Sequence, residues 1–450
     1  MKSINPATQQ VIKEFNRLSY EDGIKEIGKS RRAFFEWKTK PIAYRAKLLK
    51  KVSSVLKRNK NEYAEIITSE MGKPITESIK EIEKCAWVCE YYAENSKRML
   101  KDETVKTEMK KSYVSFEPLG IILGIMPWNF PFWQVFRFAV PALAAGNACL
   151  LKHASNVPIC STTIEEIFNK SGMKNVFKSL LIDSHTAMEL IENGLINGVS
   201  LTGSVGAGKK IAELSGKNLK KLVLELGGSD PYIVLKDADL KSCCATAIKA
   251  RMINSGQSCI AAKRFIVVKE VAKEFEKLFV EQAKLLKVGN PMNENTTIGP
   301  LAKLELADAL ELQIKDAVSK GAKILYGGYR LKGNFFMPGI ITNVEDDMKI
   351  LTEETFGPIA PIIIVKDEKE AIKVANNTEF GLGASIWTRN LKKAEKLAKE
   401  IQTGTVFING MVRSDPRLPF GGIKNSGFGR ELSHYGIKEF VNIKTVVIDK

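Results

Sequence analysis

A cysteine that closes a run of small residues is the first candidate for chemistry in this sequence. Cys259 ends the segment NSGQSC at residues 254–259. A turn built from such residues holds a side chain in a loop, and its free backbone N–H groups favour the thiolate, which is the nucleophilic form. The alternative is a small buried apolar side chain, the usual state of a cysteine.

Two further segments carry polar groups that a reaction would need. Glu225 ends the apolar run LVLE and precedes two glycines. A carboxylate at the carboxyl end of a strand in an α/β sheet points toward the ligand crevice. Asn129 lies in MPWNFP, residues 126–131, where two prolines freeze the turn, so its amide is a fixed donor for an oxyanion. The alternatives are a strand-end charge in solvent and an ordinary turn asparagine.

A glycine-rich loop, LTGSVGAG at residues 201–208, links an expected strand to an expected helix. Such a loop is able to place a phosphate at the N-terminus of the helix. It matches neither the GxGxxG fingerprint nor the P-loop pattern, so alone it is a weak signal.

The elements expected around these segments define the fold class. Apolar residues spaced three to four apart predict helices over 19–38, 43–70 and 75–99, followed by a polar, strand-like stretch to residue 115. Short apolar runs then alternate with helical segments, at 121–126, 148–152, 178–182, 198–202 and 222–226. A second alternating region spans 230–422, with strands expected at 265–268, 323–326, 339–341, 362–365, 384–387 and 405–408. This alternation predicts an α/β fold with a doubly wound parallel sheet.

Composition excludes several classes of protein. The 450 residues suffice for two or three domains, and 44% hydrophobic and 26% charged residues are typical of a soluble globular protein. No run of eighteen uncharged apolar residues is present, so we expect no contact with a membrane interior. The first ten residues lack an apolar signal region, so a cytoplasmic location is the expectation.

Charge and cysteine content leave two questions about partners. The net charge of +17 is compatible with a nucleic-acid-associated protein, but the lysines are spread along the whole chain and no nucleic-acid motif accompanies them, so we expect no nucleic-acid partner. Seven cysteines without a CxxC pair, and only three histidines, argue against a metal site. Six of the cysteines are expected to be buried thiols, with Cys259 the exception.

Taken together, the motifs resemble the aldehyde dehydrogenase family, in particular its compact branch of succinate-semialdehyde dehydrogenases. The resemblance covers nearly the whole chain, and one motif could arise by chance whereas seven in order could not. The motifs are PWNFP at 127–131, LK at 151–152, TGS at 202–204, ELGG at 225–228, GQSC at 256–259, EETFGP at 353–358 and PFGGIKNSGFGRE at 419–431.

The resemblance implies an oxidation of an aldehyde to a carboxylic acid with a nicotinamide cofactor. Cys259 matches the nucleophile, Asn129 the oxyanion donor and Glu225 the base that activates water. Because relatives that transfer the acyl group to coenzyme A lack this base, Glu225 favours a free acid as product. Further matches imply contacts with the cofactor, made by Trp128, Lys152, Ser155, Gly203, Ser204, Glu354 and Phe356.

Ser155 bears on the choice between NADP and NAD. Relatives that prefer NAD often carry a glutamate three residues after the lysine matched by Lys152, and here Ser155 stands at that position. A carboxylate would repel the 2′-phosphate of NADP by about 1–4 kcal/mol at about 4 Å. The sequence therefore favours NADP, with NAD possible; the alternative is that Ser155 only caps the following helix.

The substrate is less narrowly defined than the reaction. Arg137 matches an arginine that binds the substrate carboxylate in the longer succinate-semialdehyde branch, and the helix expected from residue 132 would turn it toward the substrate tunnel if its phase is right. The second arginine of that branch has no counterpart, because Ile253 occupies its position and the nearest arginine is Arg251. Succinate semialdehyde is the expected substrate, with glyceraldehyde and medium-chain aldehydes as alternatives and a non-catalytic nucleic-acid-associated protein as the alternative of another class.

The family architecture implies three parts. A Rossmann-like cofactor domain is expected over 1–100 and 119–226, an α/β catalytic domain over 227–430, and a small β oligomerisation element over 101–118 and 431–450. The alternating tail, residues 439–448, reads as an exposed edge strand, which a second copy would cover. A homodimer or homotetramer is therefore expected.

Overall fold

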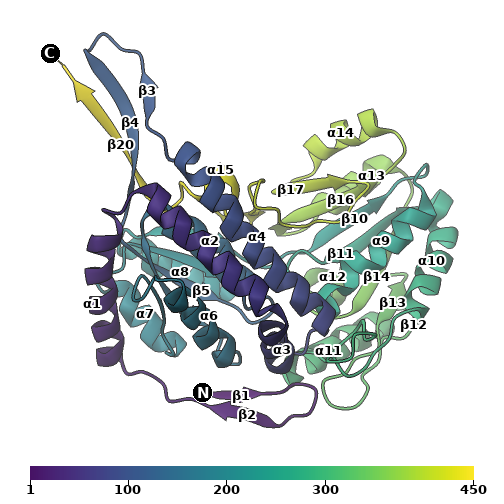
Figure 1. Ribbon diagram of the computed structural model, residues 1–450. Coiled ribbons are helices and arrows are strands. Elements are labelled where there is room, and N and C mark those ends of the chain that lie inside the picture. Colours follow the sequence, from purple (N-terminus) through teal and green to yellow (C-terminus); the bar gives the residue numbers. More distant parts are fainter. Residues whose placement is uncertain (450) are drawn as a thin grey trace.

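Two parallel sheets, each flanked by helices, form the body of the protein in a computed structural model that describes residues 1–449 (Figure 1). The first sheet has the strand order β19-β9-β8-β5-β6-β7, and all of its strands run parallel except β19. Its strands are β5 (Ile121–Met126), β6 (Ala148–His153), β7 (Phe177–Ser179), β8 (Gly198–Thr202), β9 (Lys221–Glu225) and β19 (Gly427–Phe428).

The second sheet has the order β12-β13-β14-β11-β10-β16-β17 and is parallel except for β12. Strands such as β10 and β16 are buried along their whole length, as is usual for parallel strands with both faces covered. The strands are β10 (Asp230–Val234), β11 (Ala262–Val268), β12 (Lys323–Tyr326), β13 (Gly339–Thr342), β14 (Ile359–Val365), β16 (Gly383–Trp387) and β17 (Thr405–Ile408).

The helices fall into two groups that follow the chain. The first group packs on the first sheet and comprises α1 (Tyr20–Trp37), α2 (Ile42–Arg58), α3 (Lys60–Met71), α4 (Ile75–Met99), α5 (Trp133–Ala145), α6 (Pro158–Lys170), α7 (Ser184–Glu192) and α8 (Val205–Lys217). The second comprises α9 (Leu240–Met252), α10 (Lys269–Lys284), α11 (Leu304–Ser319), α12 (Lys349–Thr352), α13 (Glu368–Asn376), α14 (Leu391–Glu400) and α15 (Ser433–Gly436), with a short 3-10 helix, η1 (Ile253–Gly256). Two small pairs complete the list: β1 (Lys2–Ile4) with β2 (Val11–Glu14), and β15 (Phe380–Gly381) with β18 (Ile423–Lys424).

The fold prediction is confirmed in class and in most elements. The predicted helix over 43–70 is wrong in one respect, because it divides at Asn59 into α2 and α3. Asn59 ends α2 and its side chain donates to the carbonyl of Val55, so the backbone turns there rather than continuing. The division into domains stays a prediction, although β19 lies in the range expected for the catalytic domain and pairs with β9 of the first sheet.

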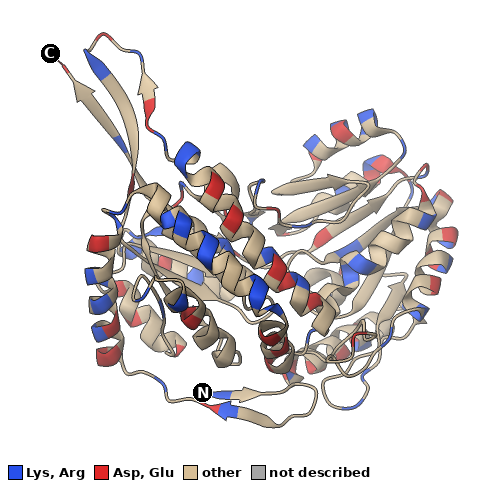
Figure 2. Ribbon diagram, in the orientation of Figure 1, with Lys and Arg blue, Asp and Glu red and all other residues tan. Residues whose placement is uncertain are grey.

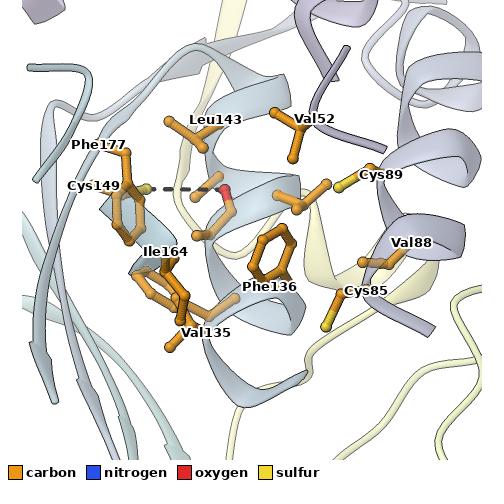
Figure 3. Packing of buried hydrophobic residues seen from close by; sticks show 14 of the residues in the cluster. Val52, Cys85, Val88, Cys89, Val135, Phe136, Leu143, Cys149, Ile164 and Phe177 are labelled. Atoms are coloured by element: carbon orange, nitrogen blue, oxygen red, sulfur yellow. Dashed lines mark hydrogen bonds between the residues drawn. The ribbon is translucent and has the colours of Figure 1, made fainter. Parts of the chain in front are cut away.

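Buried thiols help to fill the core under α4. Figure 3 shows Cys85 and Cys89 of α4 directed toward Phe136 of α5, with Val52 of α2 beside them. The prediction that six cysteines are buried is confirmed, and Cys259 alone is partly accessible. Burial raises the pKa of Cys85 and of Cys89 well above the usual value, so these thiols are inert packing groups.

A three-stranded arm projects from the body and contains the tail (Figure 1). Its strands are β3 (Glu103–Val105), β4 (Lys111–Pro118) and β20 (Val441–Ile448). The predicted tail strand is confirmed, but it is not alone, since β20 pairs with β4 along its full length. β20 is nevertheless an outer strand, and Ile443 on it is 60% exposed.

The distribution of charged residues, the hydropathy of the helices and the arrangement of possible metal ligands bear on binding to a partner, a membrane or a metal ion. In the view of Figure 2, helices such as α1 carry both basic and acidic residues, whereas α2 carries basic residues alone. No helix within residues 1–449 is long and apolar enough to cross a membrane. The same residues contain no group of three or more side chains placed to hold a metal ion.

Candidate active site

The loops that follow four parallel strands meet at one edge of the first sheet. Asn129 follows β5, Lys152 lies near the end of β6, Gly203 follows β8, and Glu225 ends β9. Because these strands are neighbours in the order β9-β8-β5-β6, their carboxyl ends lie in one row. The structure therefore brings together most residues singled out in the sequence, and the loop that carries Cys259 lies against them.

Glycines allow the loops of the site to touch. A Cβ atom on Gly228 would lie 2.7 Å from the carbonyl oxygen of Cys259, and one on Gly227 would lie 2.6 Å from a carboxylate oxygen of Glu354. The ELGG segment thus packs directly on both the cysteine loop and the EETFGP loop. Any larger residue at these two positions would push the three loops apart.

The cysteine loop has a backbone conformation that its small residues make possible. Asn254 and Ser255 have φ of 52° and 54°, and Gly256 has φ of 77°. A Cβ on Gly256 would lie 2.2 Å from the carbonyl oxygen of Gly357, so this turn is seated on the EETFGP loop. Cys259 follows at the surface of a cavity, where it is partly accessible.

Asn129 is held rigidly beside this loop. Its Nδ2 donates to the carbonyl of Gln257 at 3.0 Å, and its Oδ1 accepts from Nε2 of Gln134 at 3.0 Å. Nδ2 of Asn254 donates to the carbonyl of Asn129 at 2.7 Å. The side chain is 4% exposed, so its amide has a fixed direction, as the turn sequence predicted.

A buried histidine fixes the turn that carries Asn129. The N–H of Ala154 donates to Nδ1 of His153, so Nε2 carries the proton and donates to the carbonyl of Pro131 at 2.9 Å. Burial lowers the pKa of His153 to about 4, which keeps the ring neutral. His153 therefore ties the end of β6 to the PWNFP turn, a role that its place beside Lys152 gave no reason to expect.

Glu225 is a buried carboxyl group with no hydrogen-bond partner. It is 2% exposed, and both of its side-chain oxygens lack a partner among the described residues. Nη2 of Arg137 lies 4.0 Å from Oε2. Burial raises the pKa of Glu225 to about 8, the charge of Arg137 lowers it, and the nearby Glu431 raises it. The strand-end carboxylate thus faces the interior, not solvent.

The thiol of Cys259 is also held in its neutral form. Burial raises its pKa to about 12, against the lowering effects of Arg137 and Lys263. The charges of Glu225 and Glu354 add to the rise. A cationic ring bound beside these groups would lower both pKa values, so the electrostatics of the site suit an oxidised nicotinamide.

Arg137, which matches a substrate-binding arginine of the longer branch, is held by groups of the protein itself. Its Nε pairs with a carboxylate oxygen of Glu431, Nη2 donates to the hydroxyl of Thr202 at 3.3 Å, and the guanidinium lies 4.6 Å from the ring centroid of Phe420. It is 2% exposed and is not among the residues that line the cavity at Cys259. The expectation that Arg137 faces the substrate tunnel is therefore wrong in this structure. Arg251 does not replace it, because its Nη2 donates to the carbonyl of Thr355 at 2.9 Å.

The residues expected at the cofactor fall into two places. Phe356 and Trp128 make an edge-on aromatic contact with ring centroids 5.8 Å apart, and Glu354 accepts from the N–H of Gly228 at 3.2 Å. Glu354 also pairs with Nζ of Lys263, a residue whose position four after Cys259 carried no recognisable signal.

The second place is the edge formed by β6 and β8. Lys152 is 9% exposed, and its Nζ has only the hydroxyl of Ser184 at 3.4 Å, with no carboxylate of residues 1–449 within 4.0 Å. Ser204 caps the exposed start of α8, and Gly203 donates its N–H to the carbonyl of Glu225. Ser155 is exposed, and α6 begins only at Pro158, so the alternative that Ser155 caps this helix is excluded.

Comparisons with known proteins agree with this geometry. Residues 1–446 match the aldehyde dehydrogenase family. A probable succinate-semialdehyde dehydrogenase [NADP(+)] of Synechocystis is 47% identical over 99% of both chains, and a succinate semialdehyde dehydrogenase [NAD(P)+] of Escherichia coli is 43% identical over 100% of this chain and 98% of its own. The crystal structure of the Streptococcus pyogenes succinic semialdehyde dehydrogenase with NADP+ superposes with a TM-score of 0.97, at 37% identity over 100% of both chains.

Replacing Gly256 by alanine should loosen the cysteine loop. The added Cβ meets Gly357, and the positive φ is unfavourable for alanine, so we expect a loss of roughly 1–3 kcal/mol in the free energy of unfolding and a lower Tm. Gly216 is the matched control, because it lies in α8 with open space around its Cα. Gly216→Ala should leave the Tm unchanged or raise it. Equal Tm values for the two variants would show that the close contact between Gly256 and Gly357 does not contribute to stability.

Proposed function

Because the chain belongs to the aldehyde dehydrogenase family, we propose that it oxidises succinate semialdehyde to succinate, with NADP as the preferred cofactor. The observation that carries this proposal is the full-length likeness to succinate-semialdehyde dehydrogenases at 43–47% identity, combined with the meeting of Cys259, Asn129 and Glu225 at one site. NAD remains an alternative cofactor, as the name of the relative from Escherichia coli indicates for that protein.

The reaction begins at Cys259. The thiol would lose its proton to water once the positive charge of a bound oxidised nicotinamide lowers its pKa, and the thiolate adds to the aldehyde carbon. The oxyanion of the thiohemiacetal accepts hydrogen bonds from the side-chain amide of Asn129 and the backbone N–H of Cys259. A bound oxidised nicotinamide accepts the hydride from that carbon, which leaves a thioester on the sulfur. Glu225 then takes a proton from water, and the hydroxide releases the carboxylic acid and regenerates the thiolate.

The surroundings of the cofactor residues fit NADP. Lys152 is a buried ammonium without an acidic partner, which suits the ribose and phosphate oxygens of an adenosine moiety. Ser155 offers an exposed hydroxyl and no charge at the position where a glutamate would repel a 2′-phosphate. Glu354 lies on Gly227 and Gly228, where it would bind the hydroxyls of the second ribose.

We further propose that the protein works as a homodimer or homotetramer through its arm. The outer edge of β20 has no partner strand among residues 1–449, and an unpaired edge with exposed apolar side chains favours pairing with a second copy.

A screen of aldehydes with NADP tests the proposed function. Succinate semialdehyde, glyceraldehyde and straight-chain aldehydes are compared by their kcat/KM in NADP reduction, and succinate semialdehyde is expected to give the highest value. Cys259→Ala should abolish oxidation of every aldehyde while NADP binding persists, because only a thiolate forms the thiohemiacetal. Turnover of the variant within tenfold of the wild type would refute the role of Cys259.

Glu225 should control the hydrolytic step and its pH dependence. A carboxylate acts as base only when it has lost its proton, so kcat should rise with pH below the pKa of about 8 and level off above it. Glu225→Gln should keep the initial burst of NADPH, lower the steady rate by about 100-fold and flatten this pH profile. A burst that falls together with the steady rate would place Glu225 at an earlier step.

Ser155→Glu should move the cofactor preference toward NAD. The new carboxylate gains hydrogen bonds to the free 2′- and 3′-hydroxyls of NAD and meets the 2′-phosphate of NADP as a like charge, and about 1.4 kcal/mol of difference changes the binding ratio tenfold. The ratio of kcat/KM for NADP to that for NAD is measured at low and high salt, since salt should weaken the effect. Ser155→Gln is the uncharged control of equal size, and equal ratios in the two variants would exclude the charge effect.

A further inference from the structure

A cavity of about 620 Å³ opens beside Cys259, and Arg137 is not among the residues that line it. It is lined by parts of α4, of the PWNFP turn and of the segment before Phe420, as well as by Cys259 itself. Because the nucleophile lies in its wall, this cavity is the space that an aldehyde must enter. The groups that line it therefore decide which aldehydes are accepted.

Lys84 of α4 presents an ammonium group to this cavity without an acidic partner. Its Nζ donates to the hydroxyl of Ser414 at 2.8 Å and lies 4.2 Å from the ring centroid of Trp133. No carboxylate of residues 1–449 comes within 4.0 Å of Nζ, although the chain has many exposed lysines with such partners. Burial, together with the charge of Arg137, lowers the pKa of Lys84 to about 8, whereas the charges of Glu81 and Asp415 act in the opposite direction.

Ser414 completes a set of donors around the same point. Its Oγ accepts from Nζ of Lys84 and from Nε1 of Trp133, the latter at 3.1 Å. The hydroxyl proton of Ser414 has no acceptor among the described residues, and the residue is 5% exposed. A partly buried cation and a hydroxyl with a free proton form a subsite for an anion.

Of the three acidic residues that line the cavity, Glu77, Glu81 and Glu294, the first two are engaged elsewhere. Glu81 pairs with Lys73 and accepts from the backbone N–H groups of Phe132 and Trp133. Glu77 accepts from the N–H of Asn254, and burial raises its pKa. Neither carboxylate lies within 4.0 Å of Nζ of Lys84, although the charge of Glu81 acts on it from farther away.

Arg137 cannot supply the missing charge for a substrate, since Glu431 and Glu225 hold its guanidinium. We propose that Lys84, with Ser414, binds the distal carboxylate of the substrate and so sets the preference for a short aldehyde that ends in a carboxylate. This assignment rests on the proposed function, since it assumes that succinate semialdehyde is the substrate.

The test compares succinate semialdehyde with butanal, which has the same chain length and a neutral end. The quantity measured is the ratio of kcat/KM for the two substrates. Lys84→Met should lower this ratio by about 10- to 100-fold, the range expected for losing a charged hydrogen bond to a carboxylate. Ser414→Ala should lower it by about fivefold, and Lys84→Arg should keep a higher ratio than Lys84→Met.

Lys80→Met is the matched control, because Lys80 lies one turn earlier on α4 at the exposed rim of the same cavity. The Lys80→Met variant should keep a ratio of kcat/KM for succinate semialdehyde to that for butanal within about twofold of the wild type, since exposed charges are screened by solvent. A wild-type ratio near one would refute the proposed function. A high wild-type ratio that Lys84→Met retains would overturn the role of Lys84 while the function stands. Should Lys84→Met fail to fold, as a Tm measurement would show, an unchanged ratio in Ser414→Ala would overturn the proposal instead.

Discussion

A carboxyl group buried without a hydrogen bond is the constraint around which this site is built. Glu225 is 2% exposed, and burial raises its pKa to about 8. Leaving such a group unpaired costs free energy, which the surrounding fold must supply. What the protein gains is a group whose two protonation states have similar free energies near neutral pH, which is the requirement for a general base.

The charges near Glu225 keep it in this state. Arg137 is the nearest cation, but its closest partner is Glu431, so its attraction to Glu225 acts over 4.0 Å without a hydrogen bond. If Glu431 were absent, Arg137 would be free to bind Glu225 directly and to lower its pKa. Glu431 thus occupies the arginine and leaves the base unbound, and this requires the segment 419–431 to return to the first sheet, where β19 pairs with β9.

Much of the fold could be predicted because strands buried on both faces appear in the sequence as continuous apolar runs. Strands β5 and β8, which are almost entirely buried, have the predicted bounds. The predicted bounds of β12, β17 and α4 are also correct, although β12 is mostly exposed and β17 half-buried. The direction of Arg137 could not be predicted in the same way. All thirteen residues of α5 are buried, so the helix has no polar face from which its rotation could be deduced. Only the positions of distant residues, Glu431 above all, determine where this side chain points.

The sequence likewise could not identify Lys84 as a residue that faces the cavity, because contacts with distant parts of the chain decide its position. A lysine between Glu83 and Cys85 on an amphipathic helix normally lies at its surface, and its spacing does not separate it from Lys80 one turn away. The difference arises when α4 packs beside Ser414, which is 330 residues later in the chain and closes over one lysine but not the other. Two cations, Arg137 and Lys84, therefore lie near Cys259 with separate roles. One is held by carboxylates of the protein and adjusts the base, whereas the other has no such partner and remains available to an anion that enters the cavity.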